Sequence, residues 1–237
     1  MPLIEPIVAA GMAAIVGAKS AQDAALEPSA EPAFELSFNL ALVSEYGGRR
    51  VSYSEDEIAL QGGIDLVEKS GWSFGLWAST LAKDADADLE LDFYGARSFA
   101  LGAAEISFGA SLYTFPGAED WDFGEAQASL AIPLGPIDAT FFVNYAWEQE
   151  NLGDQDNVYA GMNWTSPLGR LWGAPLSLGG SIGYEEGPFA IQGEKLDFSL
   201  SLTAEIEEIA FAVSYVDNNL QGSEGHAAWI FSISRTF

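Results

Sequence analysis

The sequence predicts an all-β fold, a transmembrane antiparallel up-and-down β-barrel of about twelve strands. From residue 33 onward, segments of about ten residues alternate between apolar and polar side chains, which is the period of a strand with two unlike faces. After residue 20 no stretch is long and apolar enough for a spanning helix, although the chain is 49% hydrophobic. The last alternating segment ends on the terminal aromatic residue Phe237. A chain of this kind can cross lipid only as a closed barrel.

The N-terminal region is predicted to lie outside the barrel. Residues 1–20 contain an apolar run, Ile7 to Gly17, followed by small residues, and are interpreted as a signal peptide cleaved near residues 18–20. Glu5 stands where such a peptide normally has a base, so a short amphipathic anchor is the alternative. Residues 21–32 are expected to be a flexible lead-in, and residues 33–237 a single barrel domain.

The strands follow one another at regular spacing. Their predicted ranges, in chain order, are 34–42, 58–66, 72–80, 89–94, 105–112, 125–132, 137–147, 158–164, 176–185, 196–203, 211–215 and 227–237. Single-chain bacterial barrels have an even number of strands, which this set satisfies.

The connections between strands form two alternating series. Compact connections are expected at residues 68–71, 98–103, 133–136, 166–175 and 205–208, and longer acidic ones at 45–57, 81–88, 116–122, 148–156, 186–194 and 217–225. Short turns lie in the periplasm and long loops outside the cell in outer-membrane barrels. The sequence therefore predicts a protein of the bacterial outer membrane with both termini in the periplasm, in contact with membrane lipid.

The two faces of the strands decide between a membrane barrel and a soluble β-sandwich or lipocalin-like barrel. The polar face carries Ser, Thr, Asn, Gly and acids with very little Lys, whereas soluble sheets commonly place Lys on exposed faces and edges. Aromatic residues such as Trp72, Trp164 and Trp229 lie at strand ends, as in interfacial girdles. Both features favour lipid outside the apolar face.

The charge balance excludes some functions. Thirty-five acids face nine bases, giving a net charge of -26, so nucleic-acid binding is not expected and cations are the natural partners. The chain has no Cys. His226 has Ser223 in the same loop but no nucleophile motif around it, so a hydrolase is a remote alternative. No catalytic site, cofactor or metal site is predicted.

A row of acids is predicted on the lumen-facing side of the strands: Glu35, Asp65, Glu90, Asp92, Glu105, Glu125, Asp138, Glu185 and Asp197. No base is placed in this row. Acidic rings select cations, although a solvated lumen wall without selectivity is the alternative. Arg49 and Arg50 lie in the first long loop, where they could form a constriction if the loop folds inward, or remain exposed if it does not.

Several sequence words resemble the TorF family of porin-type proteins. They are N-L-A-L-V-S-E-Y at 39–46, S-G-W-S-F-G-L-W-A-S at 70–79, L-E-L-D-F-Y-G-A at 89–96 and the terminal S-R-T-F at 234–237. The resemblance implies an outer-membrane β-barrel and carries over neither a solute nor any functional residue. One departure is G-G-R-R at 47–50, in the first loop.

Together these features predict a porin-like channel for passive diffusion of small polar solutes, with a preference for cations. The alternative is a structural or adhesive barrel with a plugged lumen, favoured by the bulky lumen-side residues Trp77, Tyr94, Tyr113, Phe142 and Tyr159. The closing strand, with Trp229, Phe231, Ile233 and Phe237 on one face, resembles a signal for the outer-membrane assembly machinery. The oligomeric state stays open.

Overall fold

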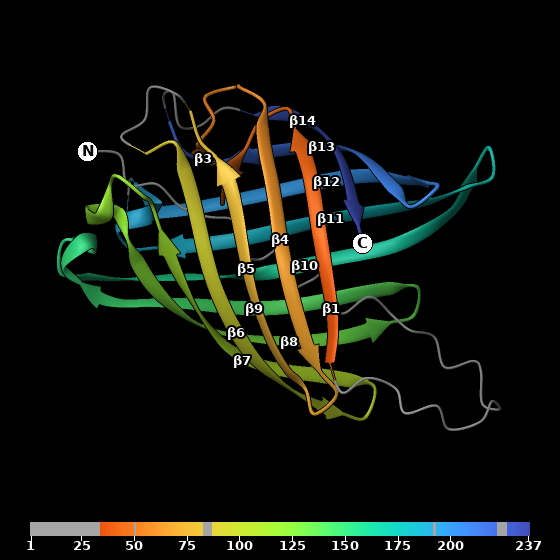
Figure 1. The fold of residues 1–237 in the computed structure, drawn as a ribbon, viewed down its shortest axis with the longest axis horizontal. Coiled ribbons are helices and arrows are strands. Elements are labelled where there is room, and N and C mark those ends of the chain that lie inside the picture. The colour runs from red at the N-terminus through yellow and green to blue at the C-terminus, as the bar shows by residue number, and fades with distance from the viewer. Residues whose placement is uncertain (1–33, 50, 83–86, 192, 222–226) are drawn as a thin grey trace.

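The computed structural model describes residues 34–49, 51–82, 87–191, 193–221 and 227–237, and in these ranges it is a closed antiparallel barrel of twelve strands (Figure 1). The predicted fold class and strand number are confirmed. The predicted signal peptide and lead-in, together with Arg50 and His226, lie outside the described residues. The barrel strands are β1 (Phe34–Val43), β4 (Ala59–Glu68), β5 (Trp72–Thr80), β6 (Leu89–Leu101), β7 (Ala104–Thr114), β8 (Phe123–Leu134), β9 (Ile137–Gln149), β10 (Gln155–Leu171), β11 (Ala174–Glu186), β12 (Glu194–Ile206), β13 (Ile209–Asn218) and β14 (Ala228–Thr236).

The barrel closes between its first and last strands. β1 pairs with β4 on one side and with β14 on the other, where Leu40 lies opposite Arg235. The terminal residue continues this pairing: the Phe237 amide donates to the Phe38 carbonyl at 2.8 Å, and the Phe38 amide donates to the Phe237 carbonyl at 3.1 Å. Closure leaves the barrel wall without an edge strand.

The apolar faces of the strands point outward. Leu36, Phe108 and Leu200 on three different strands are each about half exposed, at 54%, 52% and 48%. A soluble sandwich or lipocalin-like barrel would bury this face, so those alternatives are wrong. A closed barrel with an apolar outer band satisfies its backbone in lipid, and these features are those of a transmembrane β-barrel. In the described part of the chain, no helix has the length and hydropathy to span a membrane.

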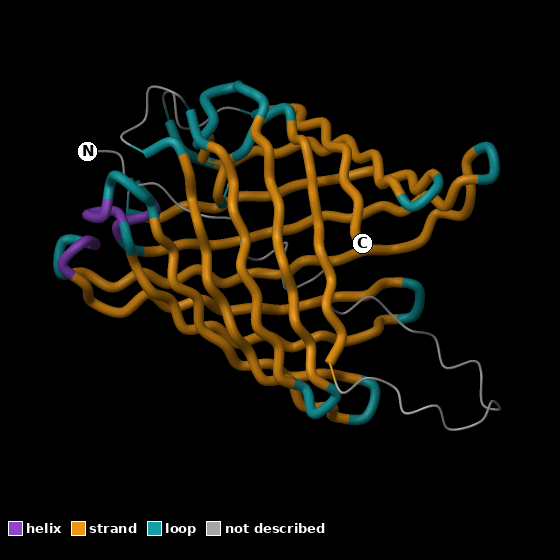
Figure 2. Tube along the Cα trace, in the orientation of Figure 1, coloured by secondary structure: helices purple, strands orange, loops and turns teal. Residues whose placement is uncertain are grey.

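The two ends of the barrel differ in their connections (Figure 2). Tight turns join the strands at one end, whereas the other end carries larger loops with three 3-10 turns, η1 (Glu119–Trp121), η2 (Glu150–Leu152) and η3 (Pro188–Ala190). The first of these larger loops also holds a small hairpin of β2 (Gly47–Gly48) and β3 (Val51–Ser52). We refer to the two ends as the turn end and the loop end. By the general rule for such barrels the turn end faces the periplasm.

Two turns are shorter than the sequence suggests. β6 continues to Leu101 and β10 to Leu171, so most of the predicted connections at 98–103 and 166–175 are strand. Beyond Thr165, β10 pairs with β11 alone, and residues 170–175 form a two-stranded ribbon that reaches farther to the right in Figure 1 than the neighbouring turns. Its backbone bulges between Pro167 and Gly169, and this irregularity hides the strand period in the sequence.

The buried hydrophobic core lies inside the barrel at the loop end. It combines residues of the first loop and of the other loops at this end with residues of the inner barrel wall: Tyr46, Tyr53, Ala59, Leu81, Ala87, Tyr113, Phe115, Ala118, Trp121, Phe123, Ala146, Leu152, Phe189 and Leu220. We call this set the mouth cluster. It sets the position of the charged groups described next.

Candidate functional site: a buried charge network in the barrel mouth

The first long loop folds into the barrel. The amides of Tyr53 and Ser54 both donate to the Tyr46 carbonyl, at 2.8 and 3.1 Å, which closes the loop on itself. The Ala82 amide donates to the Tyr53 carbonyl at 2.9 Å and attaches the loop to the end of β5. Tyr46 and Arg49 are thereby buried, at 1% and 5% exposure. Of the two loop conformations left open by the sequence, the inward one is the one present.

Arg49 spans the interior of the mouth. Its Nη1 donates to Glu185 on β11 and its Nη2 donates to Glu125 on β8, so one guanidinium links two separate parts of the wall to the first loop. The guanidinium carbon lies 4.5 Å from the centre of the Tyr159 ring and 5.8 Å from that of Phe189. A planar, permanently charged fork suits this combination of two carboxylates and aromatic faces.

Lys195 is the second buried base, and the sequence interpretation missed it. It is fully buried on β12, opposite Glu185 in the register, and its Nζ lies 2.6 Å from Glu185 Oε2. Asn157 Nδ2 donates to the other oxygen of Glu185 at 2.9 Å. The alternation indicates its face, because Lys195 is two residues from Asp197, which the sequence predicts on the lumen side.

A second acidic group lies beneath the first loop. Tyr46 Oη donates to Glu90 Oε2 at 2.7 Å, and Glu90 and Asp92 are both fully buried on the inner face of β6. Burial, together with the nearby Glu90 and Asp92 carboxylates, raises the pKa of Tyr46 well above its ordinary value, so the phenol keeps its proton and acts as a donor. Tyr113 Oη donates to Glu125 Oε2 at 3.1 Å and places this carboxylate within the mouth cluster.

The other predicted lumen acids fall into two sets. Asp65 accepts hydrogen bonds from Tyr94 and Asn39, and Asp197 accepts one from Tyr159 at 3.1 Å, so both belong to the buried wall. The remaining three do not join the network. Glu35 and Asp138 are exposed at the turn end and Glu105 is half-buried there.

Aromatic side chains fill the loop-end half of the lumen. Tyr113, Phe115, Phe123 and Phe189 are at most 2% exposed, and the Phe123 ring lies 4.5 Å from Tyr113 and 4.7 Å from Phe189, centre to centre. The turn-end half is different, because small hydroxyl side chains line it and remain partly exposed, among them the bonded pairs Ser98–Ser107 and Ser181–Ser199. The interior is thus filled by packed side chains in the loop-end half, whereas small polar side chains line it in the turn-end half.

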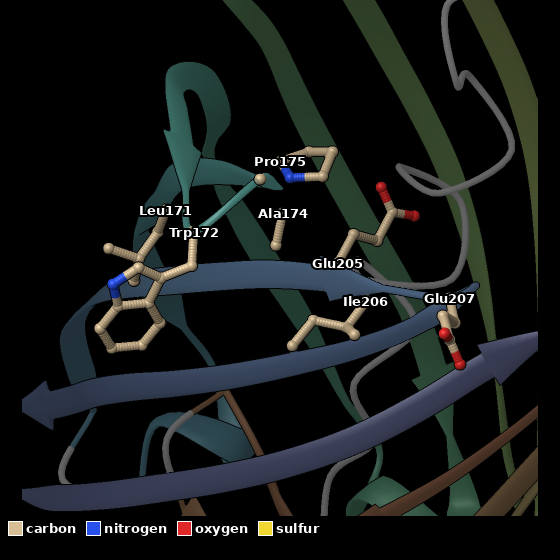
Figure 3. Close-up of a pocket in the computed structure, with 8 residues that line it drawn as sticks. Leu171, Trp172, Ala174, Pro175, Glu205, Ile206 and Glu207 are labelled. Carbon is tan, nitrogen blue, oxygen red and sulfur yellow. The ribbon is translucent and has the colours of Figure 1, made fainter.

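A shallow pocket lies outside the lumen, at the turn end, between the β10–β11 and β12–β13 turns (Figure 3). Trp172 and Ile206 give it an apolar side, and the carboxylates of Glu205 and Glu207 lie at its other side. None of the sequence-predicted lumen residues lines it. Within the described ranges, no three Asp, Glu or His side chains are grouped so as to hold a metal ion.

Comparison with known proteins agrees with the barrel fold. The model of a bacterial protein family of unknown function (Gcw_chp) matches residues 27–237. No curated protein matches the chain. The solved structure of the NanC porin aligns with 86% of this chain and 99% of its own, at 10% identity and a TM-score of 0.57. An outer-membrane channel from Pseudomonas putida F1 covers 90% of this chain and 100% of its own, at 12% identity and a TM-score of 0.47. LpxR from Salmonella typhimurium covers 85% and 99%, at 8% identity and 0.48. At these identities the likeness concerns the fold alone.

Proposed function

Because the chain belongs to the bacterial family of unknown function Gcw_chp, we propose its function from its own structure. It is a porin-like outer-membrane channel that passes small polar solutes by diffusion, prefers cations and catalyses no reaction. In the conformation described above, the first loop closes its outer mouth. The observation that carries this function is the pair of ion pairs by which Arg49 of the first loop binds Glu125 and Glu185 of the barrel wall.

The ion pairs of Arg49 are suited to a loop that can leave the barrel mouth. The described residues of the first loop are held in the mouth by the Arg49 ion pairs, the Tyr46–Glu90 hydrogen bond, packing within the mouth cluster and a few backbone bonds, and the strands paired among them are the two-residue β2 and β3. Buried ion pairs contribute little net stability, because the cost of removing charges from water offsets their attraction. Displacing Arg49 leaves the Glu125 and Glu185 carboxylates without this partner, so water or an entering cation has to take its place in the mouth.

The charge inside the wall favours cations. Asp65, Glu125, Glu185 and Asp197 are buried there, and the buried bases in the described residues are Arg49 and Lys195. The acids outnumber the bases, so a cation entering the lumen gains and an anion loses electrostatic energy. The polar turn-end half, lined by small hydroxyl side chains, provides a hydrated vestibule for the same path.

Planar-bilayer recording of the purified barrel tests this function. In a KCl gradient, we expect the wild type to show infrequent openings with a reversal potential shifted toward the equilibrium potential of K⁺. The variant Arg49→Gln should open several-fold more often, because the loop loses its charged attachment. Arg170→Gln is the matched control, because Arg170 is exposed at the end of β10, beside the turn, where it donates to the Gly173 carbonyl. Anion preference, or equal opening of the two variants, would contradict the proposed role.

A sealed structural or adhesive barrel is the second candidate. The specific observation that favours it is the dense aromatic packing of the mouth cluster, in which Tyr113 and Phe115 are fully buried. In that case Arg49→Gln gives a folded barrel, seen as a heat-modifiable band on gels, that conducts no current in bilayers. Conductance in the folded variant would rule the sealed barrel out.

A further inference from the structure

Arg97 occupies an unusual position on the outer, lipid-facing side of the wall. It lies on β6 in phase with Phe93 and Phe99, which are both exposed, and it is paired with Trp72 of β5 in the register. Charged residues on this face cost about 2–4 kcal/mol at the membrane midplane and about 0–1 kcal/mol near the interfaces. Arg97 lies beside the β4–β5 turn, with the Ser98 amide donating to the Gly71 carbonyl, and is therefore at the periplasmic interface.

The contacts of Arg97 leave its charge without a directly bound carboxylate. Its guanidinium carbon lies 5.4 Å from the Trp72 ring centre and 5.3 Å from that of Phe99. Its Nη1 donates to Ser70 Oγ at 3.1 Å, and Ser70 in turn donates to Glu68 at 2.8 Å. Among the residues that the structure describes, no acid forms an ion pair with Arg97.

Arg235 is a second outward-facing arginine at the turn end, and its charge is paired within the protein. It lies over the Phe237 ring, 4.7 Å from its centre, and its Nη2 is 2.6 Å from Glu208 Oε2. The two arginines thus share an aromatic platform and an outward position at the turn end. They differ in that Arg235 binds a carboxylate directly, whereas Arg97 is connected to Glu68 only through the Ser70 hydroxyl.

We propose that Arg97, Trp72 and Phe99 bind the phosphate group of a glycerophospholipid in the periplasmic leaflet. Guanidinium forks match phosphate oxygens in two-point hydrogen bonds, and aromatic residues of a girdle lie at headgroup depth. The stacked rings of Trp72 and Phe74, 5.9 Å apart and within 6° of parallel, continue the site toward the bilayer core, where acyl chains lie. This lipid site does not depend on whether the pore is open.

Native mass spectrometry of the detergent-purified barrel with added phosphatidylglycerol tests the site. We expect one lipid to remain bound to the wild type under activation that strips the others. Arg97→Gln should lower that retention by about tenfold, the effect of losing one charge-assisted contact. Arg235→Gln is the matched control and should change it by less than about twofold, because its charge is already paired. Arg97→Lys should retain an intermediate amount, since it keeps the charge without the fork.

Three results would overturn the lipid site. Equal retention by the wild type and Arg97→Gln, with both barrels heat-modifiable and therefore folded, would show that the arginine binds no lipid. Equal losses in Arg97→Gln and Arg235→Gln would show nonspecific attraction to the rim. Displacement of the lipid by millimolar inorganic phosphate would identify a site for free phosphate and not for a phospholipid.

Discussion

Tyr46 joins the first loop to the acids of the barrel wall. Its phenol donates to Glu90 at 2.7 Å, and its ring packs against Tyr53 and Trp77, with centres 5.3 and 5.5 Å away. A phenol in this position must keep its proton, because a phenolate beside Glu90 and Asp92 would add a third negative charge to a buried group. Burial and the two neighbouring carboxyl groups therefore raise the pKa of Tyr46.

The pH dependence of stability follows from this residue. Since the pKa of Tyr46 is higher in the folded barrel than in the unfolded chain, its contribution is complete below the ordinary tyrosine value near 10 and is lost as pH rises above it. Tyr46→Phe removes the bond to Glu90 and should lower the free energy of unfolding at pH 8 by about 1.5–3 kcal/mol. The variant should also lose less stability than the wild type between pH 8 and pH 11, measured by urea unfolding in detergent. A steeper alkaline loss in Tyr46→Phe would contradict this assignment.

The strands were predictable from the sequence, and the loops were not. A strand facing lipid on one side and the lumen on the other imposes a strict period of two, so β1, β12 and β14 can be assigned face by face. A loop has no period, and nothing local indicates that Arg49 turns inward to meet two acids 76 and 136 residues away. The mouth cluster likewise assembles from separate loops, and Lys195 lies just before residue 196, where the sequence predicts its strand to begin, although β12 begins at Glu194.

The closing strand β14 gives a prediction at the scale of one element. Deletion of Phe237 removes two backbone hydrogen bonds to Phe38 and the terminal aromatic side chain, so fewer barrels should close and insert. Phe237→Leu keeps the backbone bonds and removes only the ring. We expect the deletion to slow refolding in detergent as well as insertion in cells. If the aromatic ring is a signal for the assembly machinery, as the sequence predicts, the leucine variant should affect insertion in cells alone. Heat-modifiable protein in outer-membrane fractions measures both, and normal insertion of the deletion variant would disprove the assembly role.

The molecule as a whole is inside-out relative to a soluble protein, with large apolar residues outside and charges within. This arrangement follows from the solvent on each side. Lipid accepts the apolar side chains at no cost, and the closed hydrogen-bonded wall isolates the buried acids and bases from it. The mouth cluster is then a small conventional hydrophobic core, confined to the one region where loops and wall can exclude both lipid and water.

Adjacent residues on β12 test this arrangement directly. Leu200 is exposed on the outer face at mid-strand, whereas Ser201 is half-buried on the inner face opposite Gly179 and Ser214. Leu200→Arg should lower the free energy of unfolding in lipid vesicles by about 2–4 kcal/mol, because the charge lies near the bilayer midplane. Ser201→Arg points into the polar half of the lumen and should cost less than about 1 kcal/mol, while reducing cation preference in bilayers through its added positive charge. In detergent micelles the difference should shrink, since a micelle deforms around a charge more easily than a bilayer. If Ser201→Arg were the more damaging variant in vesicles, the assignment of the two faces would be reversed.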